Sequence, residues 1–217
     1  MAEKNRKKII LTVVGGIIIA LLIVISYYWI NNALYITTED SKVTGDLVKI
    51  SPQSTGKIAD ILIDEGSIVT KNEITARLDL LNQSDANVEL SMIRSPINGI
   101  IVKKQGTIGE ILSAGQVLAY VIDPAKLYIV ANIEETKINK VKIGQKVEIK
   151  IDQFSGKKFI GHVSRIGKVS TSAFSLLPSS SGTAYTKVVQ KIPVNIDFDK
   201  HEEVFTSGTN TIIKIIL

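Results

Sequence analysis

The sequence has no cysteine and only two histidines, His162 and His201, among its 217 residues. The lack of cysteine excludes disulfide bonds and thiolate metal sites. The two histidines are not at a ligand spacing, and zinc needs three or four convergent ligands, so we expect no metal site. They also suggest no Ser-His-Asp arrangement, and we expect no catalytic residues.

Aromatic residues are scarce as well, at 6%, although hydrophobic residues together reach 45%. The core must therefore consist mainly of Ile, Val and Leu, and β-branched side chains favour strands. The net charge is only +5, of which the tail at residues 1–8 holds +3. The remaining charge is spread thinly over the chain, so we expect no nucleic-acid partner. The length allows one large domain or two small ones.

One long segment carries no charge at all, the 22 residues of the range 9–30. As a helix this segment would be about 33 Å long, enough to cross a hydrocarbon core of about 30 Å. Tyr27, Tyr28 and Trp29 close it, as aromatic side chains do at a membrane–water interface. The basic tail before it predicts a cytoplasmic N-terminus.

A cleaved signal peptide and a buried core helix are the competing interpretations of this segment. A signal peptide has a shorter apolar region, about 7–15 residues, followed by a small-x-small cleavage site that is missing here. We therefore predict a single-pass transmembrane helix at 9–30 in the cytoplasmic (inner) membrane. The bulk of the chain would then be extracytoplasmic.

The chain repeats one phrase: "SPQSTGKIADILIDEG" begins at Ser51 and "SPINGIIVKKQGTIGE" at Ser95. At a constant offset of 43, three turn residues of the first phrase stand opposite three of the second: Gly56, Gly66 and Asn72 opposite Gly99, Gly109 and Gly115. Each half has the pattern strand, turn, strand, turn, strand. Because a half of about thirty residues cannot bury its apolar face alone, we predict that 51–78 and 95–122 form one β-sandwich.

The rest of the chain has a different pattern after the turn signal Asp123-Pro124. Short alternating strands such as "KLYIVANIEE", "FIGHVSRIGKVS" and "TNTIIKIIL" predict a small antiparallel β-barrel at 124–217, with Gly161 and Gly167 at bends or bulges. The segment 171–186 is rich in Ser, Thr, Gly and Pro and is predicted to be a loop. Residues 31–50 are expected to be a linker and a strand that leads into the sandwich, and pairing of this strand with the barrel is left open.

The paired half-motifs resemble the lipoyl/biotinyl domain over 51–123, with 79–94 as a short connection. In carrier members of that family a lysine in the turn between the halves carries the cofactor. This chain has no lysine from Leu78 through Val102, so there is no amine to acylate. We therefore expect no cofactor, and an enzyme subunit of the carrier class is the weaker interpretation.

The order of segments resembles the membrane fusion proteins, or periplasmic adaptors, of the HlyD/EmrA type. "EDSKVTGDLVKISPQSTGKI", "IRSPINGII" and "ANIEETKINKVKIGQKVEIKID" are similar to their entry, return and first barrel segments. "TSAFSLLPSSSGTAYTKVVQKIPVNID" is similar to the EmrA branch in particular. The resemblance implies a mainly β fold, with an N-terminal transmembrane helix, a barrel-sandwich hybrid and a small β-barrel.

The same resemblance implies an export adaptor, with a polytopic membrane transporter as its partner. A major-facilitator type is favoured, an ATP-binding-cassette (ABC) type stays open, and the adaptor is expected to be a homo-oligomer. The alternative is a structural or sensory envelope protein that uses the same domains. Many family members insert a coiled-coil hairpin between the sandwich halves, and residues 79–94 are too short for one. Either an envelope without an outer membrane or deletion of a hairpin would account for this.

Phe174, Leu176 and Leu177 lie in the predicted loop and have two interpretations. They fold back over the end of the barrel, or they form an apolar patch that contacts a partner or a hydrophobic substrate.

Overall fold

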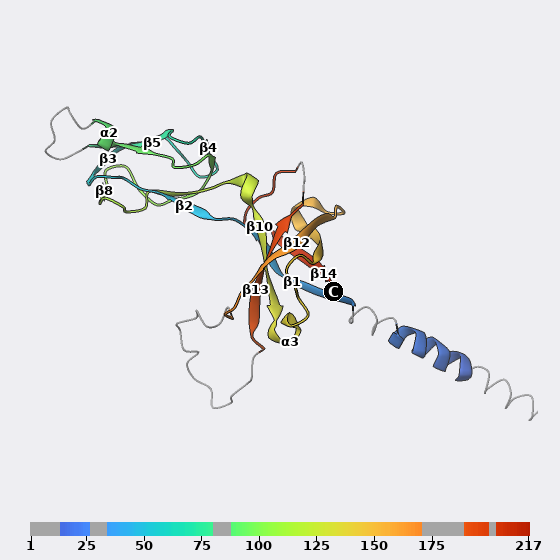
Figure 1. Cartoon of the computed structure of the whole chain (residues 1–217). Helices are drawn as coiled ribbons and strands as arrows, with labels where there is room; N and C mark the ends of the chain where they lie inside the picture. Colours follow the sequence, from blue (N-terminus) through green and yellow to red (C-terminus); the bar gives the residue numbers. More distant parts are fainter. Residues whose placement is uncertain (1–13, 27–33, 80–87, 171–188, 200–202) are drawn as a thin grey trace, which may run out of the picture.

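The protein is described by a computed structural model that covers residues 14–26, 34–79, 88–170, 189–199 and 203–217. Figure 1 shows an elongated arrangement with a sandwich at one end, a barrel in the middle, and helical residues 14–26 beyond the barrel. Within the described ranges, no helix combines the length and the apolar character needed to cross a membrane. The predicted anchor at 9–30 includes residues outside those ranges.

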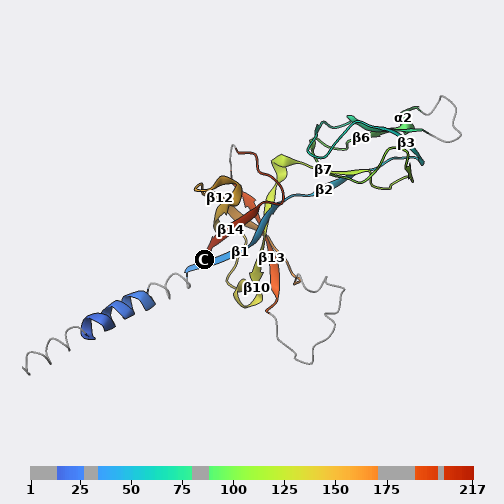
Figure 2. The same ribbon diagram turned by 180° about the vertical axis from the view of Figure 1, so that it is seen from behind.

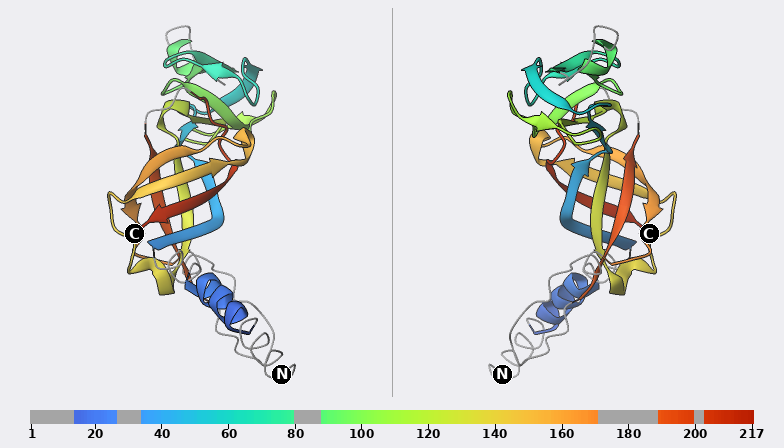
Figure 3. Two further views of the ribbon diagram at one scale, coloured as in Figure 1. Left: turned by 90° about the vertical axis from the view of Figure 1, so that its right-hand side faces the viewer. Right: turned by 90° about the vertical axis from the view of Figure 1, so that its left-hand side faces the viewer.

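Six antiparallel strands close into the barrel, which Figure 3 shows from two sides. In barrel order they are β1 (Tyr35–Thr44), β10 (Tyr128–Glu134), β13 (Lys191–Phe198), β12 (Phe159–Ile166), β11 (Lys146–Ile151) and β14 (Asn210–Ile216). A short helix, α3 (Glu135–Ile138), follows β10, and the 3-10 turn η3 (Asp152–Phe154) follows β11. The core is almost entirely Ile and Val, with Phe159 and Phe205 at one end. This composition confirms the prediction of a β-branched core.

The sandwich has two four-stranded sheets facing each other, visible from behind in Figure 2. The first contains β2 (Leu47–Ile50), β9 (Ala119–Ile122), β7 (Gly99–Lys104) and β4 (Ile68–Val69). The second contains β6 (Met92–Arg94), β5 (Ile74–Asp79), β3 (Gly56–Ile61) and β8 (Ile111–Leu112). With β2 counted with the first half and β6 with the second, each sheet holds two strands from each half of the repeat. The halves therefore share one hydrophobic core, separate from that of the barrel.

Four of the six predicted turn residues lie in turns as the repeat predicts, whereas Gly56 and Gly99 are the first residues of β3 and β7. Gly66 and Gly109 have φ of 86° and 89°, and Asn72 and Gly115 have φ of 69° and 80°. Asn72 is the one non-glycine with positive φ among the described residues. Asn tolerates this region better than most side chains, which explains how it replaces glycine in the first half.

The structure corrects the role predicted for Gly161. The irregularity in β12 lies between Val163 and Arg165, whereas Gly161 keeps its place in the ladder opposite Phe198. A Cβ on Gly161 would overlap the carbonyl oxygen of Asp197 on the next strand. This position therefore requires glycine because two backbones approach closely, and no bend is involved.

The segment expected as a linker and lead-in strand is divided between the two domains. β1 closes the barrel between β10 and β14, and only β2 joins the sandwich, where it pairs with β9. The strands that pair with β2 and β1, namely β9 and β10, also follow each other in the chain, because β9 leads through the 3-10 turn η2 (Pro124–Lys126) into β10. Two chain segments therefore connect the domains.

Candidate functional site

The site residues predicted from sequence lie outside the described residues. This holds for Tyr27, Tyr28 and Trp29 and for Phe174, Leu176 and Leu177, so their roles stay predictions. His201 is also outside. His162 lies on β12 with its Nδ1 3.2 Å from Asp199 Oδ1, and both side chains are about half exposed. The described residues contain no group of three or more His, Cys, Asp or Glu that could hold a metal ion.

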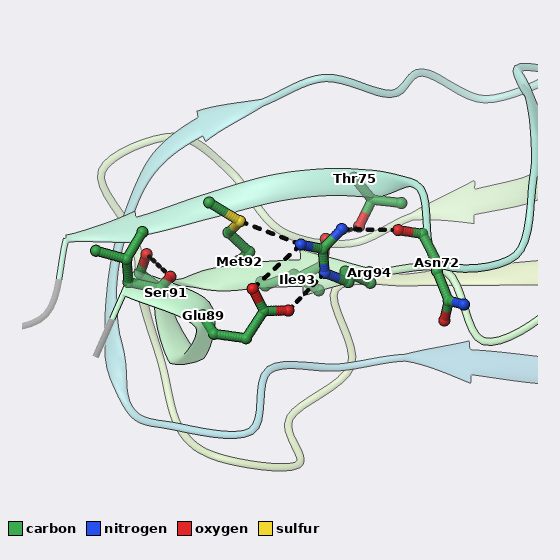
Figure 4. Close-up of polar contacts among 8 residues, drawn as sticks. Asn72, Thr75, Glu89, Ser91, Met92, Ile93 and Arg94 are labelled. Carbon is green, nitrogen blue, oxygen red and sulfur yellow. Dashed lines mark hydrogen bonds and ion pairs between the residues drawn. The ribbon is translucent and has the colours of Figure 1, made fainter. Parts of the chain in front are cut away.

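Side chains of the connection 79–94 and of the first half hold the sandwich together next to the point where its two halves join. α2 (Val88–Ser91) precedes β6, and Ser54 Oγ donates to the carbonyl of Leu90 at 2.9 Å. Arg94 binds both carboxylate oxygens of Glu89, at 2.9 and 3.2 Å (Figure 4). Its Nη1 also donates to the carbonyl of Asn72 at 2.9 Å. A single guanidinium thus ties α2 to the turn that contains Asn72.

One further side-chain hydrogen bond joins β5 to β6. Thr75 Oγ1 is buried and donates to the carbonyl of Ile93 at 3.0 Å (Figure 4). The Arg94 guanidinium lowers the pKa of the exposed Glu89 carboxyl through its hydrogen bonds. These contacts brace the second sheet of the sandwich.

The joint between the domains is tightly packed around Gly45. A Cβ at Gly45 would lie 2.9 Å from Ile122 Cδ1 and 2.9 Å from Leu127 Cδ2, so the two connecting segments pack directly on each other. Tyr128, the first residue of β10, donates its hydroxyl to Asp46 Oδ1 at 3.1 Å. Burial raises the pKa of Tyr128, and the hydrogen bond to Asp46 adds to this. These contacts hold the sandwich and the barrel together at the two connecting segments.

A second polar group bridges β1 and β10 where their backbones are no longer paired. The two strands pair only over Ser41–Thr44. Beyond this, Thr38 Oγ1 donates to the carbonyl of Asn132 at 3.2 Å, and Asn132 Nδ2 donates to Asp40 Oδ1 at 3.0 Å. Lys191 Nζ reaches the other oxygen of Asp40 at 2.6 Å. These hydrogen bonds, first from Lys191 and then from Asn132, hold the pKa of Asp40 below its usual range.

The sandwich-facing end of the barrel is filled by aromatic rings. Four of the five phenylalanines gather there: Phe154, Phe159, Phe198 and Phe205, with ring centroids 4.5–5.9 Å apart in their contacts. Two open hollows beside them measure about 400 and 490 Å³. Their charged walls form ion pairs, Lys157 with Glu203 at 3.0 Å and Lys158 with Glu148 at 3.6 Å. These pairs leave a balanced, solvated surface rather than a charged binding site.

Sequence reasoning missed Arg94, Asp46 and the Asp40–Lys191 pair. The repeat offers no signal for Arg94, because its counterpart at the offset of 43 is Ser51. Asp40 and Lys191 are 151 residues apart and meet only because the barrel closes. A local motif could not identify them.

Two family models match the chain one after the other. The model described as "RND MFP, barrel-sandwich hybrid domain" covers residues 46–124, and the "YknX-like beta-barrel domain" covers 127–215. YhbJ of Bacillus subtilis (strain 168), whose name provisionally assigns it to an efflux system, is 35% identical over 182 residues. That match covers 83% of this chain and 79% of YhbJ. The chain belongs to the membrane fusion protein family.

Other members of the family are longer or more distant. The multidrug export protein EmrA of Haemophilus influenzae is 34% identical over 132 residues, which cover 60% of this chain but only 34% of EmrA. The membrane fusion protein Spr0693 of Streptococcus pneumoniae R6 superposes with a TM-score of 0.59 at 12% identity, covering 84% of this chain and 98% of that one. The structural similarity supports the fold, and the sequence matches support the family.

Proposed function

We propose that this membrane fusion protein is the adaptor subunit of a bacterial export system and works without catalysis of its own. The observation that carries the proposal is the order of its parts. An apolar segment at 9–30 precedes a barrel and a barrel-sandwich hybrid whose tip has no lysine to acylate. The names of YhbJ and EmrA, an efflux component and a multidrug export protein, support the same role.

In this proposal the segment 9–30 is a single-pass anchor in the cytoplasmic membrane with the N-terminus inside. The barrel and sandwich stand outside as a collar next to a polytopic transporter, which supplies the energy. The similarity to EmrA favours a major-facilitator type of transporter. The segment between β5 and β6 has only twelve residues, so the collar would act without a coiled-coil hairpin, which needs at least three heptads per helix.

Deletion of the gene in its own host tests the proposal. We expect export substrates to accumulate in the deleted cells, and the full-length chain should restore export when supplied in trans. Unchanged accumulation of a broad panel of substrates, combined with an altered cell wall or signalling response, would instead favour a structural or sensory envelope protein.

The predicted loop residues give a sharper variant of this test. We expect Phe174→Asp or Leu177→Asp to uncouple export while circular dichroism and expression stay normal, if these side chains contact a partner. An unfolded variant would support the interpretation that they cover the end of the barrel.

A further inference from the structure

The end of the barrel at which β1 begins carries apolar side chains that nothing in the described structure covers. Because the barrel is closed and antiparallel, β1, β13 and β11 begin at this end, and β10, β12 and β14 end there. We call this end the helix-side rim. Its exposed apolar residues are Leu34, Ile143, Val169 and Val189, which are 47%, 69%, 47% and 51% exposed.

The same rim is basic. Its exposed lysines are Lys140, Lys142, Lys146 and Lys168, and none of them makes an ion pair with another described residue. The acidic residues nearby are Glu134, which pairs with Lys137 at 2.9 Å, Asp40, which pairs with Lys191 at 2.6 Å, and Glu135. On the sandwich-facing rim, by contrast, Lys157 and Lys158 are both paired with carboxylates. The barrel therefore has one end with an unbalanced positive charge.

The most exposed apolar residue of the rim is presented by a rigid turn. Gly144 has φ of 88° and donates its N–H to the carbonyl of Val163 at 2.8 Å. Gln145 accepts the N–H of Lys142 at 2.9 Å and donates to the carbonyl of Lys140 at 3.2 Å. Ile143 is thus held at the outermost point of this barrel turn, between lysines. The turn therefore presents an exposed apolar side chain beside lysines, a combination suited to the membrane–water interface.

Chain length places this rim near the bilayer if residues 9–30 are the anchor. From Ile30 to Leu34 the chain advances four residues, which span at most about 14 Å when fully extended. Leu34 belongs to the rim, since its carbonyl accepts the N–H of Leu217 at the end of β14. The chain therefore keeps the rim within about 14 Å of the end of the anchor, and lysines that come within one Debye length of an anionic surface, about 8–10 Å, are attracted to it.

We propose that the helix-side rim is a membrane-surface contact that takes anionic phospholipid headgroups. Ile143 and the other apolar residues enter the interfacial region, and Lys140, Lys142, Lys146 and Lys168 bind the phosphates around them. This inference rests on the anchor included in the proposed function. It adds a role for the barrel, whose end rests on the outer leaflet and so sets the height and tilt of the sandwich.

The absence of cysteine makes a direct test possible with the full-length chain. Ile143→Cys would be labelled with an environment-sensitive fluorophore and the protein reconstituted into vesicles that contain a lipid-attached quencher. The matched control is Ile68→Cys, an equally apolar and 79% exposed site on β4 of the sandwich. Both sites are exposed, so neither substitution should disturb folding.

We expect the label at 143 to shift to the blue and to be quenched in phosphatidylcholine–phosphatidylglycerol vesicles, and the label at 68 to show neither change. Replacing the four rim lysines by Gln, or raising the salt concentration to 1 M, should abolish the quenching at 143.

Three results would overturn the proposal. Quenching at 143 no greater than at 68 would place the rim away from lipid. Equal quenching in pure phosphatidylcholine would remove the role of anionic headgroups. Protection of the label only after a transporter is added would assign the rim to a protein partner. None of these results touches the adaptor function, which the export assay tests separately.

Discussion

Each domain contains a glycine at which the backbone of a neighbouring strand leaves no room for a side chain, and this permits a test of whether the two cores are independent. In the sandwich, a Cβ at Gly99 would overlap the carbonyl oxygen of Ile122 and lie 2.8 Å from Val121 Cγ2. In the barrel, Gly161 faces the carbonyl of Asp197 in the same way. The perturbation is Gly99→Ala or Gly161→Ala, which adds a single methyl group against a neighbouring strand.

The expected cost is at the upper end of the overpacking range, about 3 kcal/mol, because a strand backbone cannot rotate aside as a side chain can. For domains of this size that corresponds to a fall in melting temperature of roughly 12–24 °C. Since the two hydrophobic clusters share no residue, each substitution should destabilise only its own domain.

Hydrogen exchange with mass spectrometry measures the protection of backbone amides in each domain separately. Gly99→Ala should reduce protection in β7 and β9 and leave β12 and β13 unchanged, and Gly161→Ala should do the opposite. Ile68→Ala, at an exposed position, is the control and should change neither domain by more than about 0.5 kcal/mol. Equal loss of protection in both domains from either glycine substitution would refute independent cores and show that the joint couples them.

Three further predictions concern polar groups and a turn. The lowered pKa of Asp40 means that its bonds stabilise the barrel above about pH 4 and that this stability is lost as the pH falls through the folded-state pKa. In urea titrations over pH 2–7, Asp40→Asn should therefore lose this acid-dependent part, and an unchanged pH profile would contradict the assignment. Gly115→Ala should lower the free energy of unfolding by about 1–2 kcal/mol through its left-handed backbone alone, since no atom lies within 4 Å of the added Cβ. Gly115→Asn should lower it by less, and thermal unfolding measures both variants. Tyr128→Phe removes the hydrogen bond to Asp46 and should cost about 1 kcal/mol while widening the distribution of interdomain distances between spin labels, and an unaltered distribution would show that packing at the joint suffices.

The repeat made the sandwich predictable from the sequence. Residues at one constant offset gave the positions of the turns, and Asn72 takes the left-handed conformation expected from its place opposite Gly115. The repeat could not reveal that β2 and β6 add a fourth strand to each half, because three or four residues leave little periodic signal. The sequence left open whether the lead-in strand pairs with the barrel, and it could not give the position of β1 there, for a different reason. This strand pairs with β10 and β14, far along the chain, and such pairing is set by closure of the barrel rather than by local pattern.

The functional residues were less predictable than the fold. From the residue composition we expected no catalysis, and from the missing lysine we expected no acylation. Both expectations depend only on which residue types are present. The bonds of Arg94, Asp46 and Asp40 depend on tertiary placement, which local spacing does not report. The basic, apolar helix-side rim is likewise assembled from four separate segments, and none of them has an unusual sequence alone.

The central claim is that this chain acts as an adaptor beside a transporter, and physical association tests it most directly. The full-length protein would be expressed in its native host, cross-linked gently, purified in detergent and analysed for what accompanies it. Recovery of a many-spanning transporter in near-stoichiometric amount is the predicted result, and the class of that transporter would give the energy source. Recovery of the chain alone, or with cell-wall enzymes, would contradict the account and assign the fold to a structural role.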